Sequence, residues 1–154
     1  MKRMKAASAL ALAIWMAQWG ANGVPLVAAQ KVDSLVMIAN KNNASVSKMN
    51  KSDAKRLLLG ETTSWPNGGK VLIILRTLGS GDRAAVLQRI CGMSEAEYTR
   101  HNLQATFMGE TVASVIEAPS ANAIKSFVKS NPGALGFLHA SEVDDSVKAV
   151  WPVE

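Results

Sequence analysis

The chain has 154 residues, and its 17 basic and 12 acidic side chains give a formal net charge of +5 at pH 7. Three of the basic residues, Lys2, Arg3 and Lys5, lie at the extreme N-terminus; without them 14 basic residues face 12 acidic ones, a net charge of +2. This balance leaves no basic stripe of the kind that nucleic-acid binding requires. Residues 30–154 are enough for one domain with a core of its own.

The N-terminal segment, residues 1–29, has the features of a secretory signal peptide. An apolar stretch without acidic residues, Ala6 to Trp19, follows the basic residues. It is shorter than the roughly 20 residues of a membrane-spanning helix, and small residues at 27–29 precede a cleavage point. We expect cleavage after Ala29 and a periplasmic location without stable membrane insertion. The alternative is an uncleaved anchor, since Trp15 and Trp19 interrupt the pattern; no nearby cysteine supports a lipid anchor.

The first half of the remaining chain predicts two buried strands around one helix. Residues 32–39, "VDSLVMIA", form a short apolar run typical of a strand. Asn50 or Ser52 is expected to cap a helix that runs to Leu59 and stops at Gly60. After a polar turn, the unbroken apolar run 71–75, "VLIIL", predicts a strand that is covered on both faces.

The second half predicts three helices and two strands. Asp82 is expected to cap a helix that ends near Cys91 at Gly92, and Ser94 with Glu97 forms a capping box for another helix, to about residue 107. Residues 108–119 cross back to a helix over 120–130, which stops at Asn-Pro-Gly, and residues 134–139 and 146–153 read as strands. This order predicts an α/β fold, a mixed sheet of about four to five strands with helices on both faces.

The segment "LRTLGSGDRAAVL" suggests an anion site. It leaves the strand 71–75 through Arg76, turns through Gly79, Ser80 and Gly81, and enters a helix at Asp82. Glycines permit a tight backbone and the close approach of another group, and the start of a helix attracts anions.

Catalytic and metal chemistry find no positive support. The spacing around Ser80 does not match a Gly-x-Ser-x-Gly nucleophile elbow, and Gly69-Lys70 lacks the rest of a phosphate-binding loop. His101 and His139 carry no local motif, and two scattered histidines with one cysteine make no zinc site. Cys91, which cannot form an intrachain disulfide, is expected to be a small buried residue, with a reactive thiol as the alternative. We therefore expect neither an enzyme nor a cofactor.

The order of landmarks resembles the substrate-binding proteins of phosphate ABC transporters. The segments "LVMIANKNN", "NKSDAKRLLLGETTSWPNGGKVLIILR", "GSGDRAAVLQRICGMSEAEYTRHNLQATFMGE" and "SNPGALGFL" carry the likeness. That family has a helix ending in a Gly…Trp segment, an Arg-Ser-Asp-Gly-Ser-Gly-Thr turn after a strand, and a later Asn-Pro-Gly turn. The resemblance implies one lobe of a type II periplasmic-binding-protein-like fold over residues 30–154.

The resemblance also implies the ligand and its contacts. Arg76, Gly79, Ser80, Gly81 and Asp82 would form a site for phosphate or a similar oxyanion, the turn giving backbone N–H groups and the arginine a charged fork. Two positions depart from the family, because Leu78 replaces its aspartate and Asp82 its threonine. A carboxylate at Asp82 repels an oxyanion, and as a helix cap it would be an internal anion in the site.

Two functions follow from this pattern. One is a periplasmic module that binds phosphate weakly and is accessory to a phosphate transporter or sensor. The other is a protein-interaction domain that has lost its ligand and pairs with a periplasmic protein or with a second copy of itself. Fold alone does not separate them.

Overall fold

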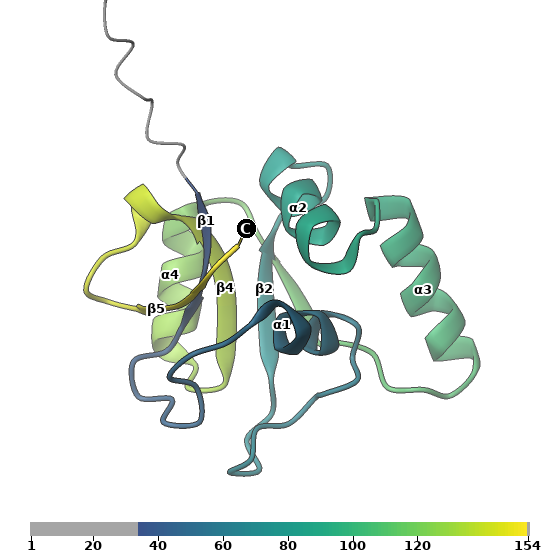
Figure 1. Ribbon diagram of the computed structural model, residues 1–154, viewed down its shortest axis with the longest axis horizontal. Helices are drawn as coiled ribbons and strands as arrows, with labels where there is room; N and C mark the ends of the chain where they lie inside the picture. Colours follow the sequence, from purple (N-terminus) through teal and green to yellow (C-terminus); the bar gives the residue numbers. More distant parts are fainter. Residues whose placement is uncertain (1–33, 154) are drawn as a thin grey trace, which may run out of the picture. The chain divides into compact units, whose positions relative to one another are not determined.

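The computed structural model of the protein describes residues 34–153, so the expected signal peptide lies outside the described residues. The described residues form five strands, the helices α1 to α4 and two shorter helical segments, η1 (π-helical) and η2 (3₁₀). Figure 1 labels the four α-helices and the strands β1, β2, β4 and β5. None of the described helices is both long and apolar enough to cross a membrane. The elements in chain order are β1 (Leu35–Ala39), α1 (Lys51–Leu58), β2 (Leu72–Arg76), α2 (Gly81–Val86), η1 (Leu87–Cys91), α3 (Glu95–Phe107), β3 (Val115–Ala118), α4 (Ala121–Ser130), β4 (Ala134–His139), η2 (Ala140–Glu142) and β5 (Lys148–Pro152).

The strands form one mixed sheet, which confirms the predicted sheet type; their order is β3-β2-β4-β1-β5. Strand β2 pairs in parallel with both β3 and β4, whereas β1 is antiparallel to β4 and to β5. Strand β3 was not predicted, because the segment 108–119 was expected only to cross back. Of its four residues only Ala118 is buried, and Glu117 interrupts the apolar residues, so the segment lacks the unbroken apolar run of β2.

Helices cover both faces of the sheet, which confirms the layer prediction. On one face, α4 buries Ile124 and Val128 in a cluster with Ile74 and Ile38. On the other face, α1 and η1 bury Leu57, Ile90 and their neighbours against the remaining side chains of β1 and β2. Successive side chains of a strand point to opposite faces, so the unbroken run in β2 serves both layers.

The predicted caps explain where several helices begin. The side chain of Asn50, rather than Ser52, caps α1 by accepting a hydrogen bond from the N–H of Asp53 at 2.9 Å. The capping box of Ser94 and Glu97 is present at the start of α3. Gly92 ends the segment 81–91 with a φ of 70°, in the left-handed region that glycine adopts without strain.

The two ends of the described range lie side by side. The N–H of Val153 donates to the carbonyl of Leu35 at 2.7 Å, and the N–H of Ala140 donates to the carbonyl of Ser34 at 2.9 Å. Because β1 runs opposite to β4, the start of β1 lies at the edge of the sheet where β4 ends. Both ends of the described chain therefore lie at the edge of the sheet that carries the glycine turn.

Candidate functional site

Three parallel strands end at one edge of the sheet. Arg76 is the last residue of β2, Ala118 the last of β3 and His139 the last of β4, and both β3 and β4 pair directly with β2. In open α/β sheets, ligands bind outside the carboxyl ends of such strands. This edge is therefore the candidate functional site.

The glycine turn connects Arg76 to the start of α2. Gly79 has a φ of 80°, which requires the conformational freedom of glycine. Ser80 has an extended backbone and caps α2, because its Oγ accepts from the N–H of Arg83 at 3.2 Å. Gly81 begins the helix, and a Cβ atom there would meet nothing within 4 Å, which leaves space for a ligand.

The prediction that Asp82 caps this helix was wrong. Asp82 is the second residue of α2, and the N-cap is Ser80. Both residue types are good N-caps, and the extended backbone at Ser80 decides between them.

The carboxylate of Asp82 lies instead between two basic side chains. Its Oδ2 is 3.4 Å from Nε of Arg76, and its Oδ1 is 3.1 Å from Nε2 of His139. The guanidinium of Arg76 is held from a further direction, because Nη1 donates to the carbonyl of Pro119 at 3.3 Å. The three side chains are 27 to 33% exposed, so the cluster lies at the surface without being fully solvated.

The structure thus brings the predicted site residues together at the start of α2. Arg76 and Asp82 are in contact, Ser80 and Gly81 begin the helix, and Gly79 shapes the turn. Sequence reasoning set His139 aside because it has no local motif. A signal was present nonetheless: His139 ends a predicted strand as Arg76 does, and the carboxyl ends of parallel strands meet at one edge of a sheet.

Arg83 is a second residue that the sequence did not single out. Its side chain is only 7% exposed; Nε donates to Glu95 at 2.8 Å, and Nη1 donates to Glu117 at 3.0 Å. Nη1 also lies 3.4 Å from the carbonyl of Arg76. Arg83 therefore ties α2 to α3, to β3 and to the end of β2, behind the glycine turn.

A cavity of about 520 Å³ opens beside Arg76 at the same edge of the sheet. Ser120 and Asn122 at the start of α4 line it, together with Lys125. The ammonium of Lys125 is paired with Asp144 at 2.8 Å. The hydrogen bond from Lys125, followed by those from Ser146, lowers the pKa of the Asp144 carboxyl. The cavity gives room for a ligand next to the guanidinium of Arg76.

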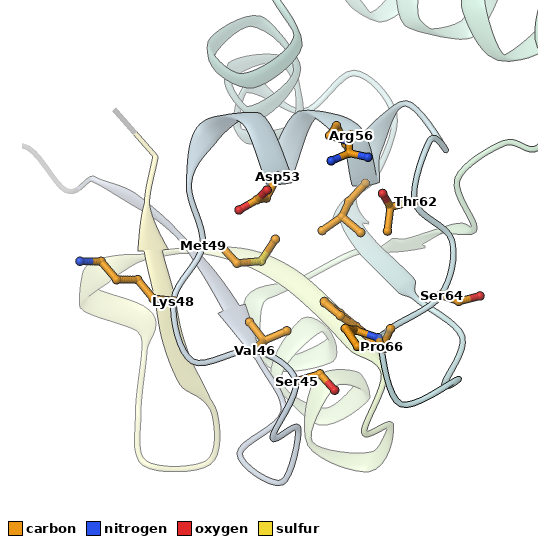
Figure 2. Close-up of a pocket in the computed structure, with 11 residues that line it drawn as sticks. Ser45, Val46, Lys48, Met49, Asp53, Arg56, Thr62, Ser64 and Pro66 are labelled. Atoms are coloured by element: carbon orange, nitrogen blue, oxygen red, sulfur yellow. The ribbon is translucent and has the colours of Figure 1, made fainter.

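A separate cavity of about 380 Å³ lies on the α1 side of the molecule (Figure 2). Its wall includes Trp65, whose indole N–H donates to the carbonyl of Gly133 at 3.1 Å. Gly133 precedes β4, so this contact lies at the opposite edge of the sheet from Arg76. The tryptophan and the Asn-Pro-Gly turn that carried the resemblance therefore contact each other, and they hold the fold together away from the candidate anion site.

The fold is that of one lobe of a periplasmic-binding-protein-like protein. No family model matches the sequence. Structural similarity to substrate-binding proteins of phosphate ABC transporters is clear, which confirms the resemblance seen in the sequence.

Three solved structures illustrate this similarity. An ABC-type phosphate transport receptor from Vibrio cholerae is 21% identical with a TM-score of 0.61, over 77% of this chain and 45% of that one. A putative phosphate ABC transporter substrate-binding protein with bound phosphate from Clostridium perfringens is 27% identical with a TM-score of 0.62, over 77% and 44%. PstS from Borrelia burgdorferi is 13% identical with a TM-score of 0.60, over 77% and 47%. The chain therefore spans less than half of each of these solved proteins.

Proposed function

We propose that this protein is a periplasmic lobe that binds phosphate or a similar oxyanion weakly at the glycine turn. The observation that carries the proposal is the position of the Asp82 carboxylate, whose two oxygens face Arg76 and His139. The two basic side chains that face the carboxylate of Asp82 can also donate to the oxygens of a bound oxyanion. The bound phosphate in the similar Clostridium perfringens protein supports the choice of ligand.

Asp82 is also the reason to expect weak binding. An incoming oxyanion must replace the carboxylate or share the site with it, and two anions at such a distance repel each other. We expect phosphate to bind in the millimolar range or more weakly, which corresponds to about 4 kcal/mol at most. A role as an accessory component of a phosphate transporter or sensor fits such an affinity better than high-affinity capture.

Calorimetric titration of the native protein with phosphate, sulfate and molybdate tests this proposal. The variant Asp82→Thr removes the repelling charge, and its phosphate affinity should rise by about an order of magnitude or more. Adding Arg76→Ala to that variant should abolish the gain, because the guanidinium is the permanent cation of the turn. Micromolar binding of phosphate by the native protein would contradict the competition by Asp82, and no binding by any form would contradict the function.

The second candidate is a protein-interaction domain, and one observation favours it. Leu78, in the glycine turn itself, is 62% exposed, and Phe107 and Met108 at the end of α3 are 83% and 74% exposed. Sedimentation analysis of the native protein and of Leu78→Ser separates the two candidates. Self-association that Leu78→Ser removes, with no oxyanion binding in any form, would favour the interaction domain.

A further inference from the structure

We propose that His139 is an oxyanion-binding residue of this site, and that Asp82 is an internal ligand which the oxyanion displaces from both Arg76 and His139. The inference rests on the proposed function, and it adds a binding residue and a mechanism of exchange. The observation behind the inference is that the carboxylate of Asp82 contacts two basic side chains, which come from different strands.

The contacts of Asp82 match those that an oxyanion would make. Its Oδ2 faces Arg76 at 3.4 Å and its Oδ1 faces His139 at 3.1 Å, so each oxygen has its own basic partner. A carboxylate and a tetrahedral oxyanion both present two oxygens on one central atom. An oxyanion in this place would therefore accept from the same two side chains, with hydrogen bonds from the guanidinium of Arg76 and from the Nε2–H of His139.

The backbone places His139 for this role. It is the last residue of β4, and its N–H donates to Oε2 of Glu142 in η2 at 3.1 Å. The ring is 30% exposed, so it lies beside its protein partners and within reach of solvent. Nε2 of the ring contacts Asp82 of α2, which is itself paired with Arg76 of β2, and the ring also accepts from the backbone N–H of Glu142 in η2.

Asp82 can leave the site without undoing the turn. The helix cap is Ser80, whose Oγ holds the N–H of Arg83, so the first turn does not depend on the Asp82 side chain. Asp82 is 33% exposed and can rotate toward water. Arg76 also keeps its hydrogen bond to Pro119 when the carboxylate moves, so the guanidinium stays at the site.

The experiment compares phosphate binding by four folded forms of the protein: native, Asp82→Asn, Asp82→Asn with His139→Gln, and Asp53→Asn. Asparagine keeps the size of the side chain and removes its charge. Asp53 also lies in the first turn of a helix, but it makes no ion pair within the described residues, so it is the matched control. We expect Asp82→Asn to bind phosphate at least about tenfold more tightly, Asp53→Asn to match the native protein, and His139→Gln to remove most of the gain.

A second readout separates binding by His139 from mere support of the fold. The charge of sulfate does not change across the pH range in which histidine titrates. A change of sulfate affinity with pH therefore reports the titration of groups in the protein. In Asp82→Asn, sulfate should bind more tightly as the pH falls through the titration of the imidazole, and His139→Gln should remove that dependence.

Three results would overturn the inference, and they differ from one another. Equal phosphate affinity of the native and Asp82→Asn proteins would contradict the exchange, while leaving oxyanion binding intact. An unchanged affinity and pH dependence after His139→Gln would contradict the role of His139 alone. No binding of phosphate or sulfate by any of the four forms would contradict the proposed function as well.

Discussion

Replacing Arg83 with alanine should destabilise the fold strongly, although arginine is usually a surface residue. The best of its contacts is the hydrogen bond to Glu95, at 2.8 Å with a partner that is 25% exposed, and such charge-assisted bonds contribute about 1.5–3 kcal/mol. Glu117 is 50% exposed, so its contact adds at most about 1 kcal/mol. The carbonyl of Arg76, at 3.4 Å, adds little. Together these values predict a loss of about 1.5–4 kcal/mol in the free energy of unfolding.

Urea denaturation followed by circular dichroism measures this loss. The matched control is Arg56→Ala, because Arg56 and Glu61 pair at 3.6 Å while both are more than half exposed. The control should change the free energy of unfolding by less than about 0.5 kcal/mol. Lysine at position 83 should recover only part of the stability, since it lacks the fork that reaches two carboxylates at once. If Arg83→Ala and Arg56→Ala lose the same stability, the buried network is not a stabilising element.

Four further predictions concern single groups. A Cβ atom on Gly133 would collide with the backbone carbonyl of Lys70, so Gly133→Ala should lose more than about 2 kcal/mol in urea unfolding, whereas Gly81→Ala should lose far less. Tyr98→Phe removes a 2.7 Å hydrogen bond to the carbonyl of Leu58 and should lose about 1 kcal/mol in the same assay. Burial raises the pKa of the Cys91 thiol to about 11, so alkylation near neutral pH should be slow in the native protein and fast in concentrated urea; equal rates would show an accessible thiolate. N-terminal sequencing of exported protein should begin at or near Gln30, and a retained Met1 in membranes would favour the anchor instead.

The sequence predicted most of the fold because its local signals agree with the packing. The apolar run at 71–75 gives a strand that is buried on both faces, and the capping residues Asn50 and Ser94 give the starts of α1 and α3. Strand β3 was not predicted because it is a short edge strand, paired only with β2 and largely unburied, so no long apolar run marks it in the sequence.

Only the part of the site that lies on one continuous loop was predicted. Arg76 and the glycine turn are neighbours in the sequence, so their motif was visible. His139 lies 57 residues beyond Asp82, and only the parallel pairing of β2 with β4 brings the two together. Arg83 was overlooked for a related reason: a charged residue in a helix is usually solvated, and the two carboxylates that allow its burial come from other elements.

The adjacent ends of the described range favour a circular permutation of residues 34–153. Since Val153 pairs with Leu35 on neighbouring strands, a short linker from 153 to 34 would bridge them, and new ends could be opened in an exposed loop such as residues 66–69. The same arrangement allows residues 34–153 to be inserted into a loop of a host protein. Both junctions would then lie at the end of the sheet where β2 and β4 end with Arg76 and His139.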